Sequence, residues 1–283
     1  VYVNIKNKII YLYIILVISP LKLIGYVLKN KSIDVVVLDL IKKRFPDNAK
    51  VNGLFFDTSN PLIFNRGTRL HTKEPDTINW IDEYINDGDV LYDIGANIGV
   101  YSLYAAKYKN ATTYSFEPES ANYYYLNKNI YHNNLSNKIK AYNIALNDSN
   151  LLSVLNLSQF RPGAGDHNFN KELDANHKKF NSAFKQGMIG LSVDDFIYEW
   201  GGETPNHIKI DVDGNEHIVI NGMTNILKDM KLKTIAIEVN LNLESDDELK
   251  NKLISYGFKL LTDERYINNE YLSNGYLNLF FVR

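Results

Sequence analysis

Cysteine is absent from all 283 residues of this chain. That absence excludes disulfide bridges, thiolate metal ligands and a cysteine nucleophile, and it fits a reducing compartment. The chain also lacks an excess of positive charge, because 31 Lys and Arg residues meet 33 Asp and Glu residues for a formal net charge of −2. Nucleic-acid binding normally requires a basic face, so we expect no nucleic-acid partner.

A third absence concerns the spacing of glycines. The strand that leads into a dinucleotide site is followed by G-x-G-x-x-G, whereas this chain has a shorter turn after its apolar strand at residues 89–92. The residues of that turn are Gly95, Ala96, Asn97 and Gly99. A helical stretch, residues 100–107, follows, so the turn is expected to offer backbone N–H groups to a ligand.

Asp93 stands at the end of the strand, directly before this turn. A carboxylate in a partly dry cleft repels a pyrophosphate and attracts a cation. S-adenosylmethionine carries a sulfonium and an ammonium group, so we predict that Asp93 faces that positive end while the turn amides hold the cofactor's carboxylate. The alternative is an ordinary turn with an exposed Asp93.

Glu117 follows the next strand, residues 112–116, at the offset where an acidic residue reaches a ribose diol. A carboxylate accepts hydrogen bonds from both hydroxyls, so Glu117 is predicted to bind the nucleoside. A plain helix cap before the following helix is the alternative. Nicotinamide enzymes use the same acid, so Glu117 alone does not identify the cofactor.

Strands and helices alternate from residue 89 onward, which predicts an α/β fold with a doubly wound, Rossmann-like and mostly parallel sheet. Two further strands, residues 208–210 and 234–237, end at acids. The final strands, residues 258–261 and 276–282, are joined without a helix, which predicts an antiparallel last strand. The expected domains are an N-terminal appendage, residues 1–50, and a catalytic domain, residues 51–283.

Three motifs occur in a fixed order: YDIGANIGVYSLYAA at residues 92–106, FEP at 116–118, and IKIDVDGNEHIVINGM at 208–223. On these motifs the chain resembles the FkbM family of S-adenosylmethionine-dependent methyltransferases, over residues 52–282. The resemblance implies the class I methyltransferase fold and O-methylation of a hydroxyl on a glycan or secondary metabolite. It also implies that Glu74 and Thr77 touch the methionine end of the cofactor, although simple helix capping explains them equally well.

The chemistry is expected at the carboxyl ends of the strands, where ligands bind in such sheets. An alcohol acceptor must lose a proton there, and Asp211 is the first candidate to orient or deprotonate it. The other candidates are Asp213, Glu216 and Glu238. Clustered carboxylates raise one another's pKa into a useful range. Capping of the next helix is the alternative for Asp211 and Glu216.

Three further expectations complete the site. Ala145 follows a strand at residues 138–143, where an adenine ring packs. The polar segment 158–186, which contains His167, is predicted to form a lid over the acceptor, because loops of that length are usually functional or disordered. Asp211 and Glu238 are also compatible with Mg²⁺, but the sequence contains no metal motif and does not decide this.

The N-terminal appendage has an apolar stretch at residues 9–28 that Pro20 and Lys22 interrupt. A membrane span needs about 20 apolar residues, and lysines flank both ends. Peripheral membrane contact, packing on the soluble domain and a span are the three alternatives. In each case we expect the catalytic domain in the cytoplasm, at the inner face of the membrane if it is membrane-bound, because the cofactor is made there.

Two other functions compete with methyl transfer. The first is a non-catalytic protein that binds the cofactor or a glycan on the same fold. The second is a nicotinamide-dependent sugar oxidoreductase. Binding of S-adenosylhomocysteine or of NAD separates these hypotheses.

Overall fold

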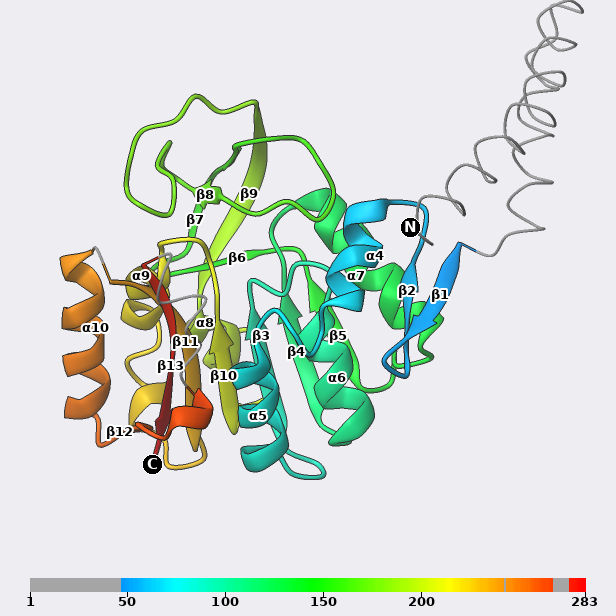
Figure 1. Cartoon of the computed structure of the whole chain (residues 1–283). Coiled ribbons are helices and arrows are strands. Elements are labelled where there is room, and N and C mark those ends of the chain that lie inside the picture. Colours follow the sequence, from blue (N-terminus) through cyan, green and yellow to red (C-terminus); the bar gives the residue numbers. More distant parts are fainter. Residues whose placement is uncertain (1–46, 242, 267–274) are drawn as a thin grey trace, which may run out of the picture. The chain divides into compact units, whose positions relative to one another are not determined.

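The computed structural model describes residues 47–241, 243–266 and 275–283 (Figure 1). The chain divides into two compact units, residues 1–49 and 50–283. The apolar stretch at residues 9–28 and a helix that the sequence predicts at residues 33–45 lie outside the described residues. Among the helices that the structure describes, none has the length and hydropathy needed to cross a membrane.

A seven-stranded sheet forms the core of the larger unit (Figure 1). Its strands, in spatial order, are β12 Lys259–Leu260, β13 Tyr276–Val282, β11 Thr234–Asn240, β10 His207–Ile210, β3 Val90–Ile94, β4 Thr112–Phe116 and β5 Ile139–Tyr142. From β11 to β5 all neighbours are parallel, and β13 is antiparallel to β11 and β12. This order confirms the predicted doubly wound sheet with an antiparallel last strand.

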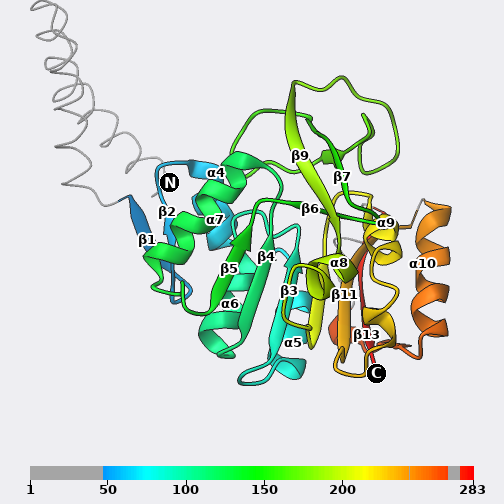
Figure 2. The same cartoon turned by 180° about the vertical axis from the view of Figure 1, so that it is seen from behind.

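Helices cover both faces of the sheet (Figures 1 and 2). One hydrophobic cluster contains α4 Pro61–Thr68, α5 Pro75–Tyr84, α6 Val100–Tyr108 and α7 Ser120–His132. The other contains α8 Val193–Tyr198, α9 Glu216–Asn221 and α10 Glu244–Ser255. Strand β3 is therefore buried on both sides: Leu91 packs in the first cluster, and Tyr92 and Ile94 pack in the second.

A second, four-stranded sheet lies beyond the main one (Figures 1 and 2). Its strands, in spatial order, are β6 Ala145–Asn147, β9 Phe184–Ser192, β7 Leu151–Leu157 and β8 His167–Phe169. The sequence predicts strands at residues 151–157 and 188–191, which correspond to β7 and the end of β9. Strand β8 falls inside the polar segment, residues 158–186, that the sequence predicts as a loop. Residues 158–183, between β7 and β9, are called the lid segment below.

The region before α5 differs from the prediction. The sequence suggests β-structure at residues 64–72, whereas the structure has helix α4 there, beginning at Pro61. The start is built by Asn60, whose side chain accepts a hydrogen bond from the Leu62 amide at 2.9 Å, and by proline at the first helical position. These capping signals outweigh the aromatic and β-branched residues that favour a strand. The connector before α4 contains two short paired strands, β1 Asn48–Val51 and β2 Leu54–Asp57.

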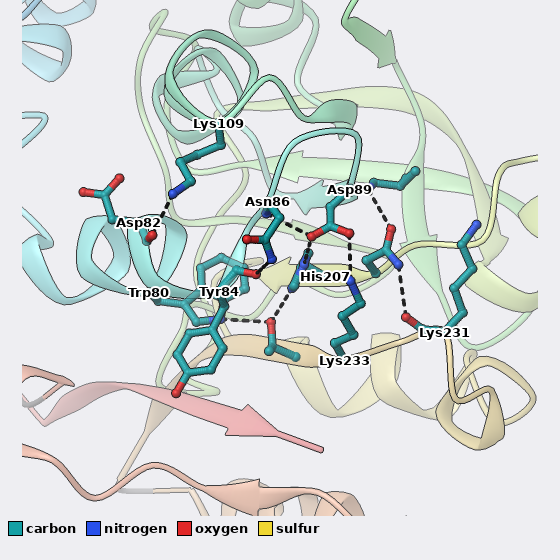
Figure 3. Close-up of polar contacts among 12 residues, drawn as sticks. Trp80, Asp82, Tyr84, Asn86, Asp89, Lys109, His207, Lys231 and Lys233 are labelled. Carbon is teal, nitrogen blue, oxygen red and sulfur yellow. Dashed lines mark hydrogen bonds and ion pairs between the residues drawn. The ribbon is translucent and has the colours of Figure 1, made fainter.

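A buried polar network joins the amino ends of three central strands (Figure 3). His207 Nε2 lies 3.1 Å from Asp89 Oδ2, and its Nδ1 lies 2.8 Å from Thr234 Oγ1. The same hydroxyl oxygen accepts a hydrogen bond from the Trp80 indole at 3.0 Å. The Asp89 carboxylate can only accept, so His207 Nε2 carries a proton, and in the neutral imidazole Nδ1 accepts from the Thr234 hydroxyl.

The network predicts sensitivity to acid. Burial lowers the pKa of His207 to about 4, below the 6.5 expected in the unfolded chain. The unfolded state therefore binds more protons than the folded state, and stability falls as pH decreases from 6.5 towards 4. We expect His207→Gln to flatten this part of the curve of unfolding free energy against pH, by up to about 3 kcal/mol for a shift of this size.

Urea unfolding of wild type and variant between pH 4 and pH 7.5 measures this effect. His71→Gln is the matched control, since His71 is exposed. Equal slopes for wild type and His207→Gln would contradict the neutral, buried histidine.

Candidate active site

A cavity of about 510 Å³ opens at the carboxyl ends of the central strands. Its floor comes from the residues that follow β3, β4 and β10, and from Glu238 in β11. Lid residues 164–167, together with Phe169 in β8, line it from the other side. The cavity therefore lies where a doubly wound sheet binds its ligands.

Seven of the residues that the sequence indicates lie on the wall of this cavity: Gly95, Asn97, Glu117, Ala145, Asp211, Asp213 and Glu238. Ala96 lines a smaller adjoining recess, together with Lys209 and Asp211. The remaining five do not line either space: Glu74, Thr77, Asp93, Gly99 and Glu216. The site is thus assembled from four strand ends, as expected, but its members have different surroundings.

The backbone amides of the turn after β3, which the sequence predicts to bind a ligand, form hydrogen bonds within the protein. The Gly95 and Ala96 amides donate to the Phe116 carbonyl at 2.9 and 3.0 Å. The Asn97 amide donates to Glu117 Oε2 at 2.7 Å, and the Gly99 amide donates to Ala96. These four groups are already satisfied, so the expectation that they hold the cofactor's carboxylate does not fit the geometry.

Gly95 and Gly99 are instead required by shape. Both adopt positive φ values, +81° and +84°. A Cβ on Gly95 would lie 1.7 Å from the Asp211 carbonyl oxygen, and one on Gly99 would lie 2.4 Å from Leu126 Cδ1. The two glycines let the turn approach β10 and α7 closely, which shapes the cavity without contributing a polar group.

Asp93 lies beneath the turn and not on the cavity wall. Its side chain is 1% exposed, and it accepts a hydrogen bond from the Ser102 hydroxyl in α6. Burial raises the pKa of Asp93, against the opposing charge of Lys209. The direct contact with a sulfonium that the sequence suggests is therefore not offered by this arrangement.

Glu117 sits on the cavity wall with both oxygens engaged by main-chain amides. Oε2 accepts from Asn97 at 2.7 Å and Oε1 accepts from Glu119 at 2.9 Å. Burial raises the pKa of Glu117 to about 8 in spite of these bonds. The two amides fix the carboxyl group in one orientation, with lone pairs left to accept from a diol.

Three carboxylates meet at the other end of the cavity. Oxygens of Glu74, Asp211 and Glu238 lie within 4.8 Å of one another. Asp211 Oδ2 accepts from Lys209 Nζ at 3.0 Å, and Glu74 pairs with Lys73. Two ammonium groups thus already balance two of the acids, and the geometry gives Mg²⁺ no added support.

Glu238 is the exception in this cluster. Among the residues that the structure describes, none forms a hydrogen bond or an ion pair with its side chain. Burial, together with the negative charges of Asp211 and Glu74, raises the pKa of Glu238 well above 4.5. A carboxylate with a raised pKa and free oxygens is better suited to accept a proton than one held in an ion pair.

Asp213 and Glu216 have separate roles in the loop after β10. Burial and the charge of Asp211 raise the pKa of Asp213 to about 7, and its Oδ2 accepts from the Asp166 amide of the lid at 2.8 Å. Glu216 accepts from the amides of Val212 and Gly214 and lies off the cavity. Glu216 therefore stabilises the loop, which is the capping alternative and not the predicted catalytic role.

Glu74 and Thr77 belong to the start of α5. The helix begins at Pro75 with Glu74 as its N-cap residue, earlier than the sequence suggests. Thr77 accepts from Asn278 at 3.4 Å and is buried. Neither side chain lines the cavity, although Glu74 belongs to the acid cluster with Asp211 and Glu238. Contact of either residue with the cofactor's methionine end stays a prediction.

Polar side chains of the protein body form hydrogen bonds with the main chain of the lid segment. Asn122 accepts from the Gly163 amide at 2.7 Å and donates to the Ala164 carbonyl at 3.1 Å. Asn97 donates to the same carbonyl at 3.0 Å, and Asn240 donates to the Ala175 carbonyl at 2.8 Å. The predicted lid over the cavity is therefore an ordered wall of it.

Sequence reasoning missed the basic residues of the site. Lys209 is 4% exposed and lies in β10 between apolar neighbours. Burial lowers the pKa of Lys209, but the negative charges of Asp211, Glu74 and Asp93 outweigh burial and raise it. A lysine inside an apolar strand, two positions before Asp211 and hence on the same face, was the available signal. Arg66, Arg69 and Lys73 also line the cavity.

The wall fits a sulfonium nucleoside. Ala145, Leu155 and Phe169 belong to one hydrophobic cluster and give the cavity an apolar patch, as an adenosine requires. Asn97 Oδ1 is buried and, within the described part of the chain, has no hydrogen-bond partner, so an acceptor is available for a donor group. Within the acid cluster, Glu238 has no ion-pair partner among the described residues, so its carboxyl group can face a cationic centre.

Comparison with known proteins gives a family match. The model described as "Methyltransferase FkbM domain" matches residues 93–260, more than half of the chain. A curated relative, the hexuronic acid methyltransferase AglP of Haloferax volcanii, is 26% identical over 202 residues, which cover 69% of this chain and 75% of the relative.

Solved structures show similar proteins at low identity. The methyltransferase FkbM from Methylobacillus flagellatus has a TM-score of 0.46 and 16% identity, over 80% of this chain and 51% of that one. The present chain thus spans about half the length of that relative. TYW2 of M. jannaschii, solved with AdoMet, has a TM-score of 0.40 and 14% identity, over 83% of this chain and 85% of that one.

Proposed function

This chain belongs to the FkbM family of methyltransferases, and from that premise we propose that it methylates a hydroxyl oxygen of a glycan or secondary metabolite with S-adenosylmethionine. One observation carries the proposal: Glu117 and Glu238 open into the same cavity from β4 and β11. Three strand spacings separate them, about 14 Å at ~4.8 Å each. That span allows a nucleoside at one end and an acceptor at the other.

The residues divide the work between binding and proton transfer. Bound S-adenosylmethionine supplies an electrophilic methyl group. Glu117 would hold the ribose hydroxyls, and the apolar patch of Ala145 and Phe169 would receive the adenine. Glu238 would accept the proton of the acceptor hydroxyl as the hydroxyl oxygen takes the methyl group, and the sulfur would leave as the neutral thioether of S-adenosylhomocysteine. Asp211, fixed by Lys209, orients the acceptor, because positioning supplies much of the rate of such a displacement.

The similarity to a hexuronic acid methyltransferase supports a sugar acceptor. A cytoplasmic site of action, and peripheral membrane contact through residues 9–28, stay predictions. They rest on where the cofactor is made and on an apolar stretch outside the described residues.

The proposal predicts a weaker cofactor complex when Glu117 is removed. Glu117→Ala should lower the affinity for S-adenosylhomocysteine by about 1–3 kcal/mol, the cost of leaving buried polar partners unpaired. Isothermal calorimetry on wild type and variant measures this, and Glu117→Gln, which keeps one acceptor oxygen, should lose less. Unchanged affinity in Glu117→Ala would remove this residue from the site.

Transfer of labelled methyl groups onto cell-envelope glycans tests turnover itself. Label in glycan supports the methyltransferase. Binding of S-adenosylhomocysteine without transfer to any fraction would favour the non-catalytic alternative, and binding of NAD in its place would favour the oxidoreductase.

A further inference from the structure

The cavity has one wall that is basic. Arg66, Arg69 and Lys73 all line it, and the same three residues line the adjoining recess. Arg66 lies in α4 and Arg69 is the residue at its C-terminal end. Residues three apart on a helix share a face, so the two guanidinium groups belong to one side of the cavity.

The charges of these residues are balanced to different degrees. Lys73 pairs with Glu74. Arg66 Nε donates to the Gly163 carbonyl of the lid at 2.7 Å, which is a neutral partner and leaves the rest of its five donors. Arg69 is exposed, and its side chain has no hydrogen bond or ion pair with any residue that the structure describes.

Of the three other arginines in the described chain, Arg265 pairs with Glu83 and Asp263, and Arg283 donates to the carbonyls of Leu227 and Tyr256. Arg161 is exposed and lies off the cavity. Among the described arginines, Arg66 and Arg69 are therefore the two that line the cavity, and neither has a carboxylate partner there. An anionic ligand is the partner that such a pair fits best, because the planar fork matches a carboxylate or a phosphate.

The cofactor's own carboxylate is one candidate for this partner, but the position of the arginines favours the acceptor. Arg69 is exposed and Arg66 is bonded to the lid, so an acceptor that enters from solvent can reach both. Asp211, Asp213 and Glu238 line the same cavity and repel an anion that the arginines do not hold. An acceptor with one anionic group would therefore point that group at the arginines and its hydroxyl at Glu238.

We propose that the acceptor is an anionic glycan, whose carboxylate or phosphate is bound by Arg69 and Arg66 while a hydroxyl group is methylated at the acid wall. This inference rests on the proposed function and specifies its substrate class. Neutral glycans lack the group that the basic wall binds and should be poor acceptors.

The first test fractionates a cell-envelope glycan extract by anion exchange before the methyl-transfer reaction. Label should enter the retained, anionic fractions at least ten times better than the unretained ones. Carbodiimide reduction of carboxyl groups should abolish this preference if the group is a carboxylate, and phosphatase treatment should abolish it if the group is a phosphate. Equal or greater transfer to the neutral fraction would overturn the inference.

The second test uses Arg69→Gln, with Arg161→Gln as the matched control, because Arg161 is exposed and does not line the cavity. Arg69→Gln should raise the KM for the anionic fraction at least tenfold and leave the dissociation constant of S-adenosylhomocysteine within twofold. A tenfold weaker S-adenosylhomocysteine complex would assign Arg69 to the cofactor's carboxylate and overturn the inference. Absence of label in every fraction would instead reject the proposed function, and this inference with it.

Discussion

Gly95→Ala should abolish cofactor binding and destabilise the fold more than any other single glycine substitution in the turn before α6. The added Cβ would lie 1.7 Å from the Asp211 carbonyl oxygen and 2.8 Å from its carbon. Both atoms belong to the main chain, so no side-chain rotation relieves the contact. The turn and the end of β10 must separate, which displaces the floor of the cavity.

Gly88→Ala separates this steric effect from the conformational one. Gly88 also has a positive φ, +77°, but a Cβ there meets nothing within 4 Å. Gly88→Ala should lower the free energy of unfolding by about 1–2 kcal/mol, the cost of a left-handed backbone conformation. Gly95→Ala should lower it by about 3 kcal/mol more, because of the steric contact. Urea unfolding and calorimetry with S-adenosylhomocysteine measure both variants. Equal losses would show that the close approach of the turn to β10 is unimportant.

Glu238→Gln should lower kcat by about 10²–10⁴-fold, the range for loss of a general base, while S-adenosylhomocysteine binds as before. The amide keeps the shape of the carboxyl group and cannot accept the proton. Because the pKa of Glu238 is raised, the wild-type rate should increase with pH through a limb well above pH 4.5. That limb should be absent from the residual activity of the variant.

Asp166→Asn is the matched control for charge. Asp166 lines the same cavity with an exposed side chain, and its contact with Asp213 uses only the main-chain amide. It removes one negative charge without touching the proposed base, and kcat should fall by less than tenfold. A similar loss in both variants would indicate a general electrostatic effect and exclude Glu238 as the specific base.

The sheet could be predicted because its evidence is local. The strand, turn and helix from Val90 to Tyr108 follow from apolar runs and two glycines. Four parallel strands, β3, β4, β10 and β11, have an acid at or near their carboxyl ends. Helix α4 is also encoded locally, because Asn60 is a favoured N-cap residue and Pro61 a favoured first residue of a helix. Capping contacts span only two residues, so they were available in the sequence.

The surroundings of the site residues could not be predicted in the same way. Whether the turn amides are free depends on the Phe116 carbonyl and on Glu117, which approach from the next strand. Whether a carboxylate can act as a base depends on whether a lysine forms an ion pair with it. Asp211 forms such a pair with Lys209. Such pairings arise from tertiary contacts between strand ends, and the order of residues in one strand does not encode them.

The attachment of the lid has a consequence for the evolution of this enzyme. Asn97, Asn122 and Asp213 bind only peptide groups of residues 163–166, and every amino acid except proline presents the same peptide donor and acceptor. The exposed side chain of Asp166 takes no part in this attachment, whereas Gly163 is constrained by its positive φ and by Leu62 and Ile63. Substitution at Asp166 is therefore a route to a different acceptor range that leaves the hold of the lid on the protein body intact.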